Sequence, residues 1–147
     1  MAGLLDPMNI ARHIALIDEL CFRPFPAEHG PSDVGFGGPG HHVAVLEADD
    51  GPGGGPARRA VTVDRFEKDR DAVYEVLASR WGDTDPWDPR TGRGETPEPW
   101  AWLGARAGVA WVWEVQGTGR WVAVAVADRG PADGIQLLAV VTETAPP

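Results

Sequence analysis

The spacing of apolar residues predicts a helix near the start of the chain. Behind Asp6-Pro7, a pair that favours the first turn of a helix, apolar residues recur every three or four positions over residues 10–21. His13 lies within this otherwise apolar stripe. Pro24 ends the helix, because proline lacks the N–H group that a helix interior needs.

A second helix is predicted from Arg65 to Trp81. Asp64, with Glu67 three residues later, partly matches a capping box at its start, although a capping box has Ser or Thr in the first position. Gly82 suits the residue just beyond the helix, where a left-handed backbone conformation favours glycine.

Alternating patterns and short apolar runs predict up to six strands. They cover residues 41–47, 59–63, 100–105, 109–116, 121–127 and 135–143. The last of them is apolar on both faces, which is typical of a central or helix-covered strand. Three stretches rich in Gly and Pro are expected to be flexible loops, at about residues 22–40, 48–58 and 83–99.

Two strands, 109–116 and 121–127, are predicted to form a hairpin whose register depends on the turn between them. If Thr118-Gly119 forms a two-residue turn, the face with Trp111 and Trp113 meets the valines at 122, 124 and 126. If the loop has three residues, the same face meets the alanines at 123 and 125. Both arrangements pack acceptably, so the sequence leaves the register open.

The order of these elements favours an α+β fold in which two helices pack on one face of a mainly antiparallel sheet of five to six strands. The length, 147 residues, suits a single domain over residues 1–147. Gly and Pro make up 33 residues, 19 and 14 respectively, but seven Trp and several Val-rich runs argue against disorder.

Charge and cysteine content narrow the possible partners and location. The net charge is −9, from 22 acidic and 13 basic residues, and no basic run exceeds Arg58-Arg59, which argues against nucleic-acid binding. The longest apolar stretch, residues 121–127, is too short for a membrane span, and the N-terminus carries no secretory signal. A single cysteine, Cys21, forms no internal disulfide. A cytoplasmic protein is therefore expected.

No pattern in the sequence indicates a metal site or a cofactor. The adjacent pair His41-His42 points to opposite faces of a strand, and no ligand spacing joins it to the other histidines, so ordinary surface or loop histidines are expected. Asp83, Asp85 and Asp88 fail as a calcium loop because Trp87 stands at its fifth position. The glycines at 35–40 lead into a strand, whereas phosphate-binding loops lead into a helix.

Catalytic residues are not predicted either. Cys21 lies on the buried stripe of the first helix, where a free cysteine acts as a small hydrophobe. The serines at 32 and 79 lack the context of an activated nucleophile.

Tryptophan is the most distinctive feature of the composition. Trp111, Trp113 and Trp121 are expected in the core or on the sheet. Three others lie in or beside the acidic 83–99 stretch, where aromatic residues next to acids favour a binding hot spot. The predicted partner-binding residues are Trp87, Trp100, Trp102, Asp83, Asp85 and Asp88.

The leading hypothesis is a non-enzymatic, acidic domain that binds a protein partner, which we expect to be basic. Bacterial immunity proteins and antitoxins are compact acidic proteins of this general kind. One alternative is a small-ligand-binding domain or an enzyme with a Trp-lined pocket, which a ligand-induced rise in melting temperature would reveal. Another is a homodimer closed through an apolar sheet face that two helices leave uncovered, which light scattering would reveal.

Overall fold

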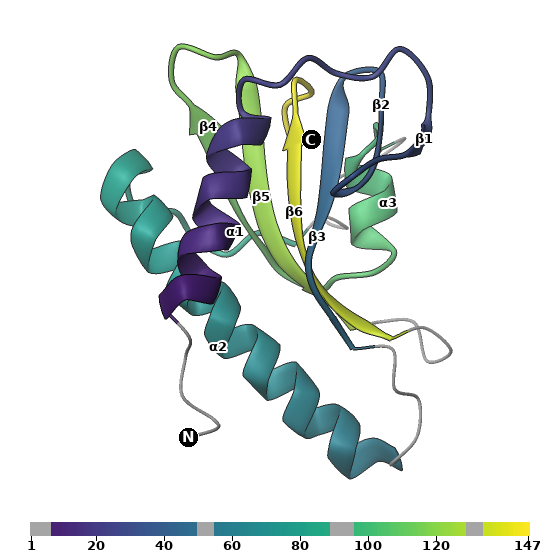
Figure 1. Ribbon diagram of the computed structural model, residues 1–147, viewed down its shortest axis with the longest axis vertical. Coiled ribbons are helices and arrows are strands. Elements are labelled where there is room, and N and C mark those ends of the chain that lie inside the picture. The colour runs from purple at the N-terminus through teal and green to yellow at the C-terminus, as the bar shows by residue number, and fades with distance from the viewer. Residues whose placement is uncertain (1–6, 50–54, 89–95, 129–133) are drawn as a thin grey trace.

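A six-stranded antiparallel sheet forms the centre of the computed structural model, which describes residues 7–49, 55–88, 96–128 and 134–147 (Figure 1). Along the chain the elements are α1 Pro7–Leu20, β1 Gly30–Pro31, β2 Gly35–Gly38, β3 His41–Asp49, α2 Gly55–Trp81, α3 Trp100–Gly104, β4 Ala110–Val115, β5 Arg120–Ala127 and β6 Ile135–Thr142. The strand order is β1-β2-β3-β6-β5-β4, and every neighbouring pair is antiparallel. The predicted α+β class is confirmed, and β6 is central, as its two apolar faces predict.

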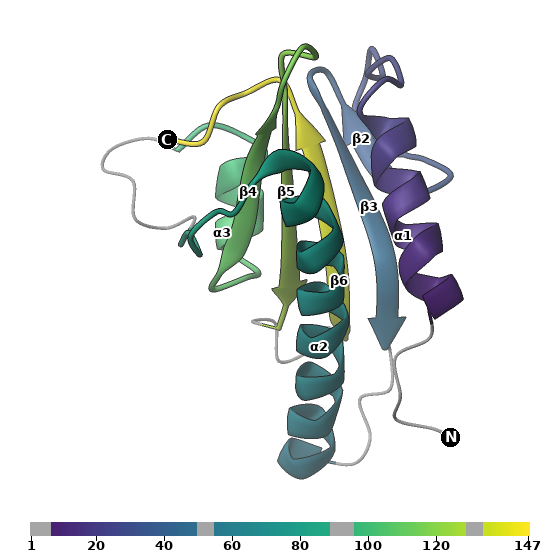
Figure 2. The same cartoon turned by 90° about the vertical axis from the view of Figure 1, so that its left-hand side faces the viewer.

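Helices cover both faces of the sheet. Buried residues of α1 and α2 form one cluster with Val122, Val124 and Val126 of β5. Trp100 and Leu103 of α3 form a second cluster with Ala123 and Ala125, which point to the opposite face of the same strand. Figure 2 shows α1 and α3 on opposite sides of the sheet. The apolar face expected to remain open for a homodimer is therefore covered by α3, although the homodimer itself stays a prediction.

The helix α3 occupies residues predicted to be a strand, and that prediction was wrong. The alternation of Trp100 and Trp102 imitates the period of a strand. The buried positions, however, are Trp100, Leu103, Gly104 and Ala107, which follow the spacing of a helix. The N–H group of Ala107 donates to the carbonyl oxygen of Leu103 at 2.9 Å, which extends the turn beyond the helix end.

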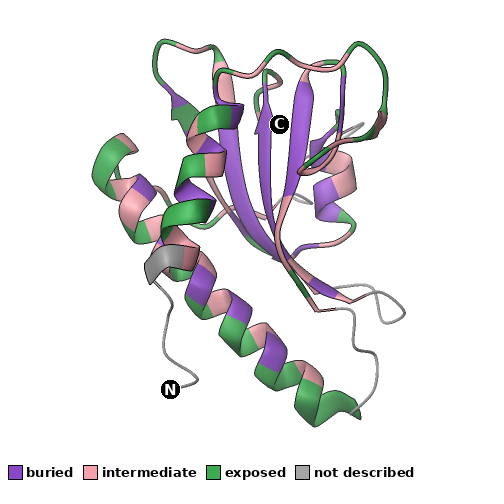
Figure 3. Cartoon of the chain, in the orientation of Figure 1, coloured by how far each residue is buried: buried purple, intermediate pink, exposed green. Residues whose placement is uncertain are grey.

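The helix α2 begins at Gly55, ten residues before its predicted start at residue 65. The strand predicted at 59–63 was therefore wrong, and so was the helix start at Asp64. Residues 55–58 of the predicted loop are also helical, and residues 48 and 49 belong to β3. The first turns of α2 extend past the end of the sheet and are largely exposed, so they lack an apolar stripe (Figure 3). Gly82 has φ +97°, which confirms the predicted left-handed residue after the helix.

Two strands lie within residues 22–40, which were predicted as a loop. A side chain at Gly35 of β2 would overlap the carbonyl oxygen of Val43, and one at Gly38 would overlap the ring of His29. Glycine therefore permits β2 to pack closely here, and the same glycines remove the apolar pattern that predicts a strand.

The hairpin of β4 and β5 has a longer connection than either predicted alternative. Trp113 pairs with Val122 and Trp111 with Val124, and residues 116–119 join the two strands. The tryptophans share a face with the valines, as the two-residue turn predicts, but the pairing is shifted by two positions. The even shift preserves the faces because side chains alternate along a strand.

Candidate functional site

The segment at residues 83–88, called the edge segment below, lies along the outer edge of β4. The N–H group of Trp87 donates to the carbonyl oxygen of Ala110 at 2.9 Å, and the N–H group of Ala110 donates back at 2.8 Å. The hydroxyl of Thr84 donates to the carbonyl oxygen of Val112 at 3.0 Å. The predicted 83–99 loop thus has an ordered first part, while residues 89–95 lie outside the described residues.

The three tryptophans predicted to bind a partner hold this region onto the sheet. Trp100 is 0% exposed, and its indole N–H donates to the carbonyl oxygen of Thr144 at 2.9 Å. Trp87 is half-buried and packs edge-on against Trp100, with ring centroids 5.2 Å apart. Trp102 is half-buried and packs edge-on against Phe36. Trp100 is consequently inaccessible to a partner, whereas Trp87 and Trp102 retain partly exposed surface.

The acidic residues of the edge segment lie closer to the surface than its tryptophan. Asp83 and Asp85 are exposed, and Asp88 is half-buried. The aromatic residue and the threonine attach the segment to β4, and the first two carboxylates are left in solvent.

The predicted sheet tryptophans lie where the pattern places them. Trp113 is buried, and Trp111 and Trp121 are half-buried on opposite faces of the sheet. The indole N–H of Trp113 donates to the carbonyl oxygen of Gly82 at 2.8 Å, so this buried polar group is satisfied.

A cleft of about 400 Å³ lies next to the edge segment and is called the Trp111 cleft below. Its apolar lining includes Pro86, Val109 and Trp111, and its charged lining consists of Glu67, Arg70 and Asp128. Pro86 belongs to the edge segment and directly follows the exposed Asp85. Val109 is 39% exposed, which is unusual for a large apolar side chain in this structure.

Arg70 lies over the indole ring of Trp111, with its guanidinium carbon 4.5 Å from the ring centroid. The guanidinium also donates to the carboxylate of Asp71 at 3.2 Å. The indole face of Trp111 is therefore already in contact with the Arg70 guanidinium. This contact shows that the cleft can accommodate a cationic side chain.

A second polar site joins α1, β3 and α2. The carboxylate of Glu47 accepts hydrogen bonds from Nε2 of His13 at 2.9 Å and from the side-chain amide of Asn9 at 3.4 Å. Asp69 lies near enough to Glu47 for each of the two carboxyl groups to shift the pKa of the other. His13 and Asp69 are buried, at 5% and 8% exposed. We refer to these side chains as the His13–Glu47–Asp69 cluster.

The two carboxyl groups of this cluster have pKa values shifted in opposite directions. Burial, the hydrogen bond with Glu47 and the negative charge of Glu47 raise the pKa of Asp69 to about 7. Burial also acts to raise the pKa of Glu47, but the hydrogen bonds from His13 and Asp69 outweigh it and lower that pKa. Asp69 therefore holds a proton to higher pH than Glu47 does.

No motif in the sequence predicts this cluster. Its only signals are the polar residues on otherwise apolar helix faces, namely His13 on α1 and Asp69 on α2. Glu47 follows an irregularity in the pairing of β3 with β6, between Val45 and Glu47, and that irregularity has no sequence signature here.

His41 and His42 are buried, at 5% and 2% exposed, so the expectation of surface or loop histidines was wrong. Burial lowers the pKa of both imidazoles. They point to opposite faces of β3, as the alternation predicts: His41 approaches the ring of His29, and His42 approaches that of Phe25.

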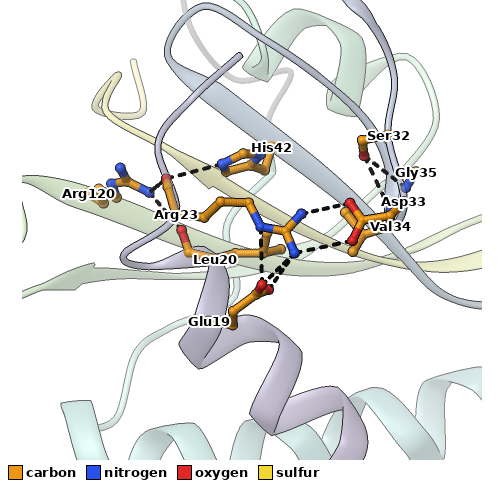
Figure 4. A network of polar contacts seen from close by, with 9 residues as sticks. All are labelled: Glu19, Leu20, Arg23, Ser32, Asp33, Val34, Gly35, His42 and Arg120. Carbon is orange, nitrogen blue, oxygen red and sulfur yellow. Dashed lines mark hydrogen bonds and ion pairs between the residues drawn. The ribbon is translucent and has the colours of Figure 1, made fainter.

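His42 belongs to a network that fastens the end of α1 to the sheet (Figure 4). Nε2 of His42 donates to the carbonyl oxygen of Arg23 at 3.3 Å. Arg120 donates from Nη1 to the carbonyl oxygens of Leu20 and Arg23, both at 2.7 Å, and lies over the ring of Phe25. These contacts satisfy carbonyl groups at the helix end, so we assign the network a structural role.

Cys21 is 2% exposed, which confirms its predicted burial, and this burial raises the pKa of its thiol to about 11. Within the four described ranges, no group of three or more His, Cys, Asp or Glu side chains is arranged to hold a metal ion.

Together these features define a small acidic α+β protein with a six-stranded antiparallel sheet between two layers of helix. No protein-family model, curated protein or solved structure matches the chain. Among the helices of the described residues, none is long and apolar enough to cross a membrane.

Proposed function

We propose that this chain is a non-enzymatic, acidic domain that binds a basic protein partner through the edge segment and the Trp111 cleft. One observation carries the proposal. The edge segment is held on β4 by three hydrogen bonds, with Asp83 and Asp85 exposed, and Pro86 of the same segment helps to line an apolar cleft.

Charge and shape support this surface in different ways. The net charge of −9 steers a basic partner toward the chain over long distances and raises the association rate. The cleft supplies apolar area, from Val109 and Trp111, that a partner side chain would bury on binding. Because the edge segment is already attached to β4, it loses less conformational entropy on binding than a free loop would.

Glu67 and Asp128 place two carboxylates in the cleft lining, against one arginine. Arg70 is already engaged by Asp71 and Trp111, so the remaining charge of the lining is negative. The partner group that fits is therefore an Arg or Lys side chain, whose aliphatic part contacts Val109 while its charged end meets a carboxylate.

The test uses a pair of substitutions of similar size that removes two negative charges, Asp83→Asn with Asp85→Asn. Both residues are exposed, so the fold is expected to be unchanged, which circular dichroism checks. The wild-type chain, immobilised at moderate salt, should retain one stoichiometric basic protein from a lysate of its own cells. That protein is then purified, and its dissociation constant is measured with each variant by calorimetry.

We expect the double variant to bind at least about tenfold more weakly than the wild type, a loss of about 1.4 kcal/mol. The matched control is Glu28→Gln with Glu143→Gln, which removes the same charge from exposed residues outside the edge segment. If both double variants bind the partner equally more weakly than the wild type, overall charge alone accounts for the effect, and the edge segment is excluded as the binding site.

A second candidate function is the binding of a small ligand in the Trp111 cleft. Its volume of about 400 Å³ lies within the usual range of ligand pockets, and its lining combines an aromatic ring with charged groups. A metabolite that raises the melting temperature of the wild type, but not of a Val109→Glu variant, would favour this function. A screen without such a metabolite would count against it.

A further inference from the structure

The outer side of α1 carries an apolar stripe that ends in an exposed phenylalanine. Ala11 and Ala15 are exposed, and Phe22 is 76% exposed, more than any other large apolar side chain of the described residues. The helical turn continues as far as Phe22, because its N–H group donates to the carbonyl oxygen of Glu19 at 3.1 Å. Spacings of four and seven residues therefore place Phe22 on the same side of the helix as the two alanines.

A groove of about 370 Å³ runs beside this stripe, between α1 and α2 (Figure 1). Its apolar lining combines Ile10 and Ile14 of α1 with Val76 of α2, and the two alanines of the stripe complete it. The volume is sufficient for a phenyl ring, since pockets from about 300 Å³ upward hold small ligands. We call this feature the α1–α2 groove. It shares no lining residue with the Trp111 cleft.

Charged groups are distributed unevenly along the outer side of α1. Near the start of the helix, Arg12 is exposed and forms no ion pair within the described residues. Near Phe22, the carboxylates of Glu19 and Asp33 share the guanidinium of Arg23, so two acids there face one base (Figure 4). This surface is therefore positive at the start of α1 and negative at its end, as the helix dipole also is. Two such helices attract each other when they run antiparallel.

We infer that the α1–α2 groove is the docking site for Phe22 of a second copy of this chain. In an antiparallel pair of α1 helices related by a twofold axis, Phe22 of each copy enters the groove of the other, beside Ala11 and Ala15. Arg12 of each copy then lies near Glu19 of the other. The same surface is used by both copies, so the assembly closes at two chains and does not extend into a polymer.

The charge and size of this surface fit a reversible dimer. Although the chain carries a net charge of −9, the charged lining of the groove is neutral, because Arg80 pairs with Asp18 at 2.6 Å. Two phenyl rings bury about 300–500 Å², which is well below the roughly 1,200 Å² of a stable interface. The association is therefore expected to depend on concentration. It uses a different surface from the proposed partner site and does not rest on that proposal.

Sedimentation equilibrium from about 10 µM to about 1 mM tests the dimer. We expect the wild type to associate reversibly and Phe22→Glu to associate at least about tenfold more weakly, because the aromatic anchor is lost. The matched control is Val61→Glu, since Val61 of α2 is 69% exposed and lies outside the groove lining. It should behave as the wild type does. A wild type that stays monomeric at about 1 mM would overturn the inference, as would a dimer that survives Phe22→Glu.

Ala15→Glu tests the other half of the contact, in case Phe22→Glu fails to fold. Ala15 is exposed, so the fold should tolerate the change, which circular dichroism checks. The charge in the groove should weaken dimerisation by the same factor of about ten or more. Unchanged dimerisation in this variant would exclude the α1–α2 groove as the docking site.

The antiparallel arrangement is tested with Arg12→Glu and Arg58→Glu, which change the charge equally at two exposed arginines. Arg12→Glu should weaken dimerisation at least about threefold more than Arg58→Glu, because it removes two exposed ion pairs between the copies. Equal effects would contradict the antiparallel pairing of α1 helices.

Nuclear magnetic resonance locates the interface directly. The methyl signals of Ala11, Ala15 and Val76 should shift with concentration in the wild type and in Val61→Glu, but not in Phe22→Glu. Concentration-dependent shifts confined to other surfaces would show that the copies meet elsewhere, and the inference would then be wrong.

Discussion

The indole N–H of Trp113 donates to the carbonyl oxygen of Gly82, and this 2.8 Å hydrogen bond joins β4 to the end of α2. Gly82 closes the helix with a positive φ and directly precedes the edge segment. One side chain thereby positions the helix end, the hairpin and the start of the proposed binding surface.

The substitution Trp113→Phe tests this hydrogen bond while keeping an aromatic ring in the core. We expect a loss of about 1–3 kcal/mol in the free energy of unfolding, since the buried carbonyl of Gly82 would lose its partner. Urea denaturation measures the loss. The comparison is Trp121→Phe, at a half-buried position on the opposite face. If Trp121→Phe lowers the free energy of unfolding as much as Trp113→Phe does, the hydrogen bond from Trp113 to Gly82 makes no specific contribution to stability.

Trp100→Ala should be far more damaging than Trp102→Ala. Trp100 is fully buried and bonded to Thr144, so its removal leaves a cavity and is expected to destabilise the fold by about 3–5 kcal/mol. Trp102 is half-buried, so Trp102→Ala should lower the free energy of unfolding by about half of that amount or less. Thermal unfolding of the two variants checks the order. The result also matters for binding studies, because a chain lacking Trp100 cannot separate lost binding from lost folding.

Gly35→Ala should destabilise the chain, whereas Gly30→Ala should change little. A Cβ atom at Gly35 would overlap the backbone of Val43, but one at Gly30 would meet nothing within 4 Å. The expected cost at Gly35 is about 1–3 kcal/mol, as for other overpacked sites. The denaturant midpoints of the Gly35→Ala and Gly30→Ala variants measure this difference. Similar midpoints would mean that β2 can shift away from β3 without loss of stability.

Cys21 should react slowly with thiol reagents at pH 8 in the folded chain. Its pKa is raised to about 11 by burial and by the nearby charge of Asp18, so the reactive thiolate is scarce at that pH. Unfolding in urea should speed the reaction by at least about a hundredfold, through both the lower pKa and the exposure. Labelling kinetics with a coloured disulfide reagent measure the ratio, and rapid labelling without urea would show that the end of α1 opens readily.

Much of the fold was predictable because its central elements carry clean periodicities. The apolar stripe of α1, the alternation in β3, β4 and β5 and the continuous apolar run of β6 indicate those elements directly. The first turns of α2 were missed because they are exposed and have no stripe to detect. β2 was missed because its glycines allow close packing and provide no apolar side chains.

The candidate sites were predictable only in part, because they depend on contacts between distant residues. Asp83 and Asp85 are acidic and lie in a Pro-rich stretch, so their exposure follows from local sequence. The burial of Trp100 instead depends on α3, which the sequence pattern did not indicate. The proximity of Asp69 to Glu47 depends on how α2 packs on the sheet, and residues 22 positions apart show no trace of it in their local patterns.

The edge segment has a consequence for the behaviour of the chain at high concentration. Open sheet edges attract strands from other molecules and so promote aggregation, and β4 is the outer strand on its side of the sheet. Trp87 and Thr84 occupy backbone carbonyl groups on that edge, and an aspartate stands on either side of Thr84. On the opposite side, the outermost strand β1 is only two residues long and ends in a proline. Both margins of the sheet are thus poor templates for fibril growth, which favours a protein that stays dispersed when it is abundant.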